Sequence, residues 1–156
     1  MESREARQFI DQLEAELGAH IGWRTFATWF ASNDGTIREY GVFLSILDDG
    51  TMYFEDFDRK PQILGFTIRP KNPVEYVKYS RRVSLDDIRS VTRVRKSHAV
   101  STCSSASGVP LCEASRIVQA LFPVVTQVEL ADGRCFYFEL ISHKDFAGAL
   151  STFQGE

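Results

Sequence analysis

Three Asp-Gly dipeptides constrain this sequence more than any other feature. They occur at positions 34–35, 49–50 and 132–133, and each lies between runs rich in β-branched and aromatic residues. An Asp-Gly pair in that setting is a strong signal for a β-hairpin, because glycine accepts the positive φ that a tight strand reversal needs. The sequence therefore predicts a sheet built from antiparallel hairpins.

The second and third turns also predict which side chains lie opposite one another. A three-residue loop at 48–50 and at 131–133 gathers the apolar side chains of each hairpin on one face. A two-residue loop would mix the faces, because a slip of one residue turns every side chain over. The expected pairs are Leu44 with Phe54, Ile46 with Met52, Ser45 with Tyr53, Val128 with Phe136, Thr126 with Phe138, and Val124 with Leu140.

Helices are predicted at both ends of the chain. Apolar residues at i, i+3, i+4 and i+7 indicate a helix over 3–18 that ends at Gly18, and a last helix that begins near Ser142, a candidate N-cap. Five serines between 97 and 107 predict a mobile loop over about 97–110, and helical spacing returns over 113–122. Strands are expected at 23–32, 37–47, 51–57, 63–68, within 74–83, and at 88–96, 124–130 and 134–141.

The first strand is apolar on both faces, so we expect both to be covered. Trp23 and Phe30 bound this run, and the helix over 3–18 can cover one face while the core covers the other. If that helix lies elsewhere, the exposed patch favours dimerisation or partner binding. The predicted fold class is α+β, with one domain over 1–156. It consists of a bent antiparallel sheet or partly open barrel of about seven strands with an N-terminal and a C-terminal helix.

Two segments resemble bacterial pleckstrin-homology-like domains. Residues 83–91 (VSLDDIRSV) are similar to a segment in which a strand, a short turn and an isoleucine lead into the next strand. The hairpin over 128–138, with the helix around Phe146 and Leu150, is similar to the final hairpin and capping helix of that superfold. The resemblance covers about a third of the chain and implies a barrel of this type.

The chain departs from that superfold in two ways. It has additional predicted helices at 3–18 and 113–122. The first hairpin of eukaryotic members carries a Lys-x-Arg pattern for phosphoinositides, whereas the corresponding turn here carries Asp48 and Asp49. The resemblance therefore implies a fold and does not imply binding of lipid headgroups.

Basic residues are concentrated in one part of the chain. Residues 59–96 contain eleven Lys and Arg against three acidic residues, a net charge of +8, while the whole chain has a formal charge of −3. Arg93 and Arg95 share one face of a strand, and Lys78 and Arg82 alternate in the same way. If the strands are adjacent, they form a basic stripe that attracts anions. The candidate binding residues are Lys78, Arg81, Arg82, Arg89, Arg93, Arg95 and Lys96.

This stripe favours a non-catalytic binding module that engages an anionic partner, either an acidic protein surface or an anionic lipid, through residues 78–96. A solvated sheet face that keeps strand edges apart explains the same charges, as does pairing with the acidic hairpin over 48–58. A structural or self-associating domain, such as a homodimer with no small-molecule ligand, is the alternative. The net negative charge argues against nucleic acid as the partner, because phosphate backbones favour positively charged domains.

No catalytic or cofactor motif is present. The sequence lacks a Gly-x-Ser-x-Gly elbow, a phosphate-cradling glycine loop and a dinucleotide fingerprint, and His20, His98 and His143 are scattered. An enzyme of unrecognised class remains a second alternative, and no cofactor is expected. Glu55 and Glu139 lie in predicted strands on the face opposite the main apolar set, so both are predicted to be exposed to solvent.

Cysteine usage and hydropathy bear on the location. Cys103, Cys112 and Cys135 are odd in number and lack the close ligand pair that nucleates a zinc site, so we expect free thiols and no metal. No apolar run approaches the ~20 residues of a membrane span, and the first residues do not resemble a signal peptide. The predicted location is therefore the cytoplasm.

Overall fold

The computed structural model describes residues 3–38, 41–56, 79–106 and 108–154, together with the backbone of 62–63 and 66–67. The helices are α1 (Arg4–Leu17), α2 (Lys96–Ser104), α3 (Arg116–Leu121) and α4 (His143–Gln154), with a 3-10 turn η1 (Leu85–Asp87). The main strands are β1 (Ile21–Ser32), β2 (Ile37–Arg38), β3 (Val42–Leu47), β4 (Thr51–Asp56), β7 (Ser80–Ser84), β8 (Ile88–Arg95), β9 (Val124–Leu130) and β10 (Cys135–Leu140). In place of a single strand over 63–68, β5 (Gln62–Ile63) pairs with β6 (Phe66–Thr67).

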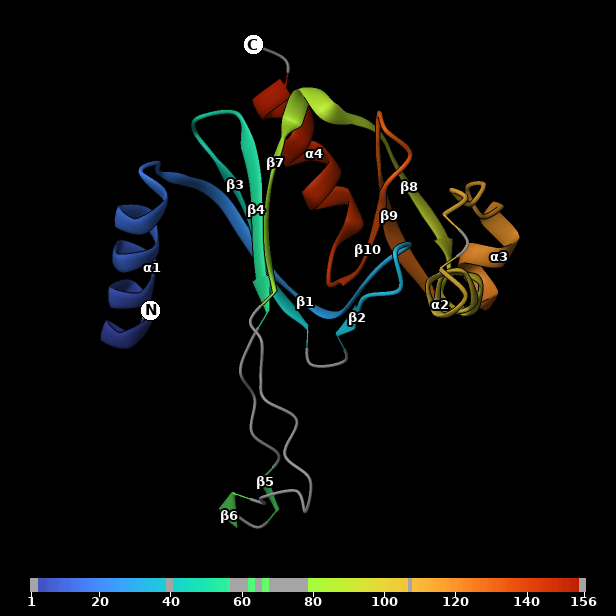
Figure 1. Ribbon diagram of the computed structural model, residues 1–156, viewed down its shortest axis with the longest axis horizontal. Coiled ribbons are helices and arrows are strands. Elements are labelled where there is room, and N and C mark those ends of the chain that lie inside the picture. Colours follow the sequence, from blue (N-terminus) through green and yellow to red (C-terminus); the bar gives the residue numbers. More distant parts are fainter. Residues whose placement is uncertain are drawn as a thin grey trace.

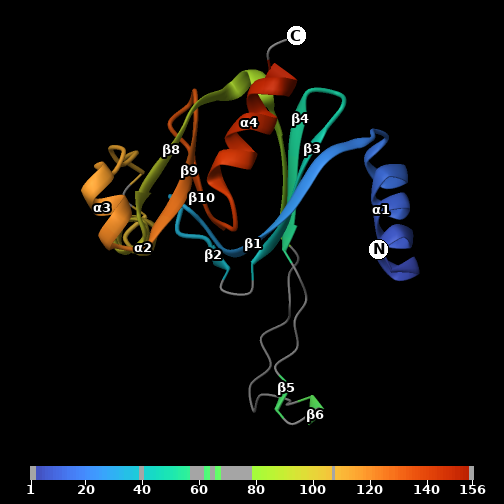
Figure 2. The same ribbon diagram turned by 180° about the vertical axis from the view of Figure 1, so that it is seen from behind.

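The eight main strands form one antiparallel sheet that is strongly bent and not closed (Figure 1). Their order is β7-β4-β3-β1-β10-β9-β8, with β2 paired to β1. Helix α4 lies on the concave side, and η1 crosses above it from one edge strand to the other (Figures 1 and 2). The predicted α+β class, with a bent antiparallel sheet and a helix at each end, is confirmed. None of the described helices is long and apolar enough to span a bilayer.

Both predicted three-residue turns are confirmed. Gly50 and Gly133 have φ of 82° and 91°, and their N–H groups donate to the carbonyls of Leu47 (3.3 Å) and Leu130 (3.0 Å). The left-handed conformation explains the glycine at each position. The expected pairs that form are Leu44 with Phe54, Ser45 with Tyr53, Ile46 with Met52, Val128 with Phe136, and Thr126 with Phe138.

Strand β1 is covered on its inner face and only partly on its outer face. On the inner face Phe30 is completely buried, and the ring centroids of Phe54 and Phe138 lie 5.1 and 5.3 Å from its own. On the outer face α1, which Ser3 caps and Gly18 ends, packs its Phe9 ring edge-on to Phe43 at 5.4 Å between centroids. The helix over 3–18 therefore packs on the outer face at the neighbouring strand β3, while Phe26 of β1 remains 52% exposed, so the predicted cover of both faces of β1 is only partial.

The serine-rich segment predicted to be a loop over about 97–110 is helical for most of its length. Helix α2 runs from Lys96 to Ser104, and its Ala99 and Cys103, one turn apart, are completely buried. They pack in a second core cluster with Trp29 and Tyr137. The prediction was wrong because serine content reports local preference, whereas burial of one helix face overrides that preference.

Two other predicted elements are shorter than expected. The strand over 37–47 is divided into β2 and β3, and Gly41 precedes β3 with φ of 83°. A Cβ at this position would lie 2.0 Å from the carbonyl oxygen of Ala27, so only glycine fits. The helix over 113–122 is reduced to α3, which begins after Ser115, whose hydroxyl accepts a hydrogen bond from the Val118 N–H (3.2 Å).

Candidate functional site

The predicted basic residues are divided between the two edge strands of the sheet. Strand β7 pairs with β4 and β8 pairs with β9, so the two basic strands are not hydrogen-bonded neighbours (Figure 1). The position predicted at Lys78 lies outside the described residues. Strand β7 carries Arg81 and Arg82, β8 carries Arg89, Arg93 and Arg95, and Lys96 is the first residue of α2.

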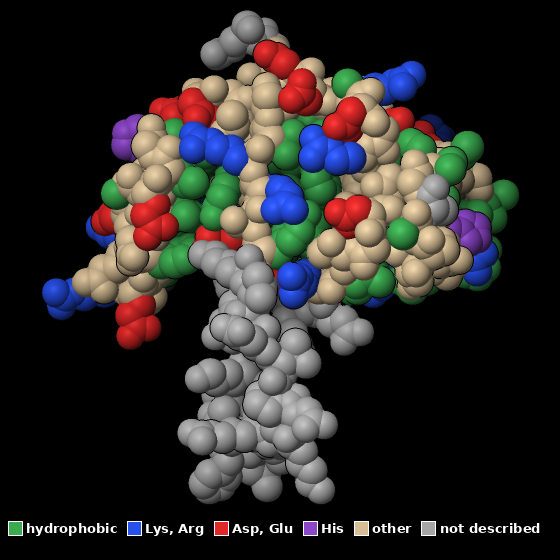
Figure 3. Space-filling view, in the orientation of Figure 1, with side chains coloured by type: hydrophobic (Ala, Val, Ile, Leu, Met, Phe, Trp, Pro, Cys, Tyr) green, Lys and Arg blue, Asp and Glu red, His purple; other side chains and the backbone are tan. Residues whose placement is uncertain are grey.

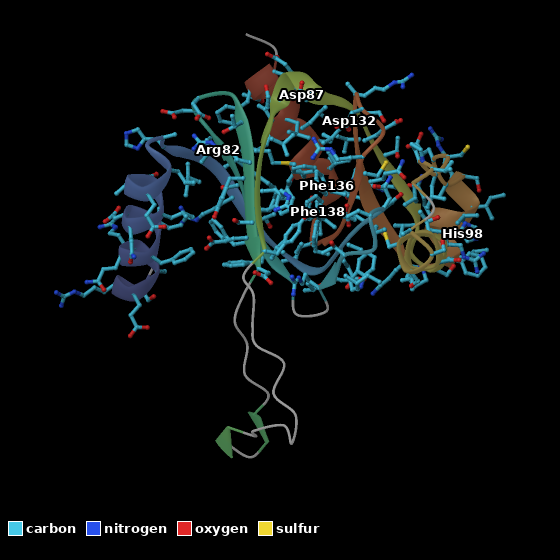
Figure 4. All side chains as sticks on the ribbon, in the orientation of Figure 1. Arg82, Asp87, His98, Asp132, Phe136 and Phe138 are labelled. Carbon is cyan, nitrogen blue, oxygen red and sulfur yellow. The ribbon has the colours of Figure 1, made fainter. Side chains whose placement is uncertain are left out.

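The arginines of β7 are engaged within the protein. Arg82 lies between α1 and the sheet (Figure 4), where its guanidinium forms an ion pair with Asp49 and donates to the carbonyl of Leu17 at 3.0 Å. Burial opposes ionisation of Asp49, but hydrogen bonds from Thr51 and Arg82 outweigh it and lower the pKa of the carboxyl. The Arg81 guanidinium carbon lies 4.4 Å from the ring centroid of Tyr79. Arg82 therefore links β7 to the end of α1 and to the turn between β3 and β4.

The basic groups at the end of β8 have different surroundings. Lys96 Nζ lies 2.7 Å from a carboxylate oxygen of Glu139, and this hydrogen bond lowers the pKa of Glu139. The guanidinium of Arg95 lies over the Phe122 ring, 3.8 Å from its centroid. Arg93 and Arg95 have no carboxylate partner within the described part of the chain. Among the described residues, therefore, no direct ion pair compensates their charges.

Large apolar side chains are exposed beside these cations. Ile117 and Leu121, one turn apart on α3, are 71% and 70% exposed, and Phe122 is 40% exposed. Val100 of α2 and Phe122 line a groove of about 410 Å³ together with Arg95. Helices α2 and α3 lie side by side at this end of the molecule (Figures 1 and 2), where Figure 3 shows hydrophobic side chains at the surface. We give the name α2–α3 surface to Arg95, Val100, Ile117, Leu121 and Phe122.

A second cavity, of about 290 Å³, lies where β8 and β9 meet the first residues of α4. We call this cavity the α4 pocket. Its polar lining consists of Arg93, Thr126, Ser142, His143 and Lys144. Apolar side chains from β9, from the end of β10 and from the residue after it complete the walls.

The α4 pocket holds an unprotonated histidine at neutral pH. His143 Nδ1 lies 2.8 Å from Thr126 Oγ1. Burial lowers the pKa of His143 below its usual value, and the Arg93 charge lowers it further, while Glu113 acts in the opposite direction. The imidazole is therefore neutral near pH 7.

Sequence reasoning missed this pocket, because it assigned the start of the last helix to capping alone. Capping is confirmed for Ser142, whose Oγ accepts a hydrogen bond from the Asp145 N–H at 3.2 Å. His143 does not cap and bonds Thr126 instead. The available signal was Thr126, a polar residue on the predicted apolar face of the third hairpin.

The two strand glutamates have different environments. Glu139 is 35% exposed at its side chain and ion-paired, whereas Glu55, predicted to be exposed, is only 4% exposed. Glu55 lies opposite Phe43, on the face that α1 covers, and accepts a hydrogen bond from the Tyr53 hydroxyl at 2.7 Å. The prediction for Glu55 was wrong because it treated that face as solvated.

The cysteines have free thiols, of which only Cys112 is exposed. Burial raises the pKa of Cys103 to about 12 and that of Cys135 to about 11. Across the described ranges, no three His, Cys, Asp or Glu side chains gather in a way that suits a metal ion.

We expect one thiol to react with a disulfide reagent in the native protein at neutral pH. Cys112 should react first, because a reagent needs both access and thiolate, and burial denies both to Cys103 and Cys135. Mass spectrometry of peptides after timed labelling, with and without denaturant, measures this order. Labelling of Cys103 in folded protein as fast as that of Cys112 would contradict it.

Comparisons of the chain with protein-family models, with curated proteins and with solved structures found no match. The α2–α3 surface and the α4 pocket are therefore interpreted from their own geometry.

Proposed function

We propose that the protein is a non-catalytic interaction module whose α2–α3 surface binds an acidic protein partner. The observation that carries this proposal is the guanidinium of Arg95 over the exposed Phe122 ring, which directly follows α3 and its exposed Ile117 and Leu121. Exposed apolar side chains next to arginine and aromatic groups are typical of protein interfaces, whose centres are enriched in these residue types.

The charge of the surface favours an acidic partner. Arg93 and Arg95 lack carboxylate partners among the described residues, and the exposed Arg116 is the first residue of α3, directly before Ile117. Opposite charge on a partner would steer its approach, while the apolar side chains would supply the buried area. Lys96 contributes less, because it is already paired with Glu139.

We infer a relationship to pleckstrin-homology-like domains from the same structure. The hairpin of β9 and β10 is followed directly by α4, and α4 lies on the concave side of a bent antiparallel sheet. Helices α1, α2 and α3 would then be additions to that superfold. We also retain the cytoplasm as the proposed location, supported by the three free thiols.

A synthetic peptide tests the interaction if it forms an amphipathic helix with Leu side chains on one face and Glu side chains on the other. We expect salt-sensitive binding that weakens about tenfold or more in Arg95→Glu, because the charge reversal turns a contact of about 1.5 kcal/mol or more into repulsion. Leu121→Ser should weaken it to a similar degree. Fluorescence anisotropy of the labelled peptide at low and high salt measures both effects.

Arg89→Glu provides the matched control. It makes the same charge change on the same strand, but Arg89 does not belong to the α2–α3 surface, so binding should be nearly unchanged. Equal losses in Arg89→Glu and Arg95→Glu would contradict a defined site. Binding to anionic vesicles instead of the peptide would identify a membrane as the partner, and a mass that rises with concentration would identify self-association.

A further inference from the structure

The α4 pocket gathers positive charge and hydrogen-bond donors from separate elements. Arg93 comes from β8, and Ser142 and Lys144 come from the start of α4. The Arg93 guanidinium has five N–H groups, and its one hydrogen bond to described residues joins Nη1 to Gln119 Oε1 at 3.3 Å. Lys144 is exposed and has no ion-pair partner in the described ranges. Two cations therefore line one cavity, and most of their donors have no partner in the part of the chain that the structure describes.

The first turn of α4 adds neutral donors to these charges. The N–H groups of Asp145 and Phe146 are satisfied by Ser142, through Oγ at 3.2 Å and the carbonyl oxygen at 3.3 Å. The N–H groups of His143 and Lys144 have no partner among the described residues. Free N–H groups at a helix N-terminus favour an anion, here within a cavity that also holds two cationic side chains.

We propose that the α4 pocket binds a phosphate group, either as free phosphate or at the end of a phosphomonoester. Two cations line the cavity, and although Glu113 offsets part of their charge at His143, they favour a phosphate dianion over a single carboxylate. The volume of about 290 Å³ lies just below the roughly 300–1,000 Å³ typical of ligand pockets. It accommodates a phosphate with a small substituent against the apolar walls.

This site goes beyond the proposed interaction surface. Its ligand is a small dianion, and Ser142, His143 and Lys144 lie outside the α2–α3 surface, with only Arg93 near both. Variants at Lys144 and Leu121 therefore separate the two activities. Lys144→Ala should leave binding of the acidic peptide unchanged, and Leu121→Ser should leave binding of phosphate unchanged.

His143 offers an internal reporter of the bound anion. The charged groups that act on its ring are Arg93 from β8 and Glu113 from the segment before α3, and Lys144 from α4 lines the same cavity. A bound dianion would stabilise the imidazolium, so the pKa of His143 should rise in phosphate relative to chloride at equal ionic strength. An NMR titration of the His143 ring measures this shift.

The decisive experiment is a heteronuclear NMR titration of the folded protein with inorganic phosphate, with acetate and with phosphatidic acid vesicles. We expect phosphate to shift the resonances of Arg93, His143 and Lys144, and Lys144→Ala to weaken the affinity about tenfold, as for loss of one charge-assisted hydrogen bond. Arg116→Ala, which removes an exposed cation outside the pocket, is the control and should bind phosphate like the wild type.

The outcomes separate the proposal from its alternatives. Vesicle binding with the same dependence on Lys144 would identify a lipid as a source of the phosphate, and a response to the free ion alone would identify a soluble ligand. Acetate acting as strongly as phosphate would overturn the assignment of a dianion. A phosphate response that is absent, or identical in Lys144→Ala and the wild type, would overturn the site itself.

Discussion

Alanine at position 41 is expected to lower the free energy of unfolding by about 3 kcal/mol or more, the range of severe single substitutions. Gly41 has φ of 83°, a conformation that costs an L-residue about 1–2 kcal/mol. In addition, its Cβ would lie 2.0 Å from the carbonyl oxygen of Ala27, a backbone atom of β1. The β1–β3 pairing would have to open to relieve that overlap. Urea denaturation followed by circular dichroism measures the loss.

Gly50→Ala is the matched control for this prediction. Gly50 has nearly the same φ, 82°, but no atom lies within 4 Å of its hypothetical Cβ. Only the conformational cost of about 1–2 kcal/mol should therefore remain. If both variants lose the same stability, the close approach of Gly41 to β1 is not what requires glycine there.

Phe30→Ala should also destabilise the protein strongly, by about 3–5 kcal/mol, as expected when a buried phenylalanine is truncated. The Phe30 side chain is completely buried, and four aromatic rings surround it at centroid distances from 5.1 to 6.1 Å. These rings belong to β4, to β10 and to Tyr79. Alanine would leave a cavity on the concave side of the sheet, between the rings of β4 and those of β10. Phe136 and Phe138 of β10 point into the space beside α4 (Figure 4).

The control for Phe30 is Phe26→Ala on the same strand. Phe26 is 52% exposed and contacts Phe43 at 5.4 Å between ring centroids on the outer face. Its truncation removes less buried area and leaves no closed cavity, so it should cost less than half as much. Similar losses in the two variants would show that the ring cluster around Phe30 is not the principal core.

Local features made the hairpins predictable. The positive φ at Gly50 and Gly133 and the alternation of side chains are both encoded within a few residues of each turn. Helix α2 was not predictable in this way, because Ala99 and Cys103 are buried by strands distant in the sequence. The interruption at Gly41 depends on Ala27, which belongs to another strand.

The candidate site could be predicted only in part from the sequence. Alternation along one strand placed Arg93 and Arg95 on the same face, and their β-bridge partners Thr126 and Val124 agree with it. The separation of β7 from β8 could not be anticipated, because η1 carries the chain across to the opposite edge instead of forming a hairpin. The approach of His143 to Thr126 likewise depends on how α4 docks.

The position of β1 at the centre of the sheet has a consequence for biosynthesis. One edge of β1 pairs with β2 and β3, which follow it directly, but the other pairs with β10, and 111 positions separate Thr28 from its partner Glu139. A ribosome therefore delivers an unpaired central strand long before its second neighbour, and open edges of this kind template aggregation. Premature termination before β10 should accordingly be far more damaging to the cell than loss of α1.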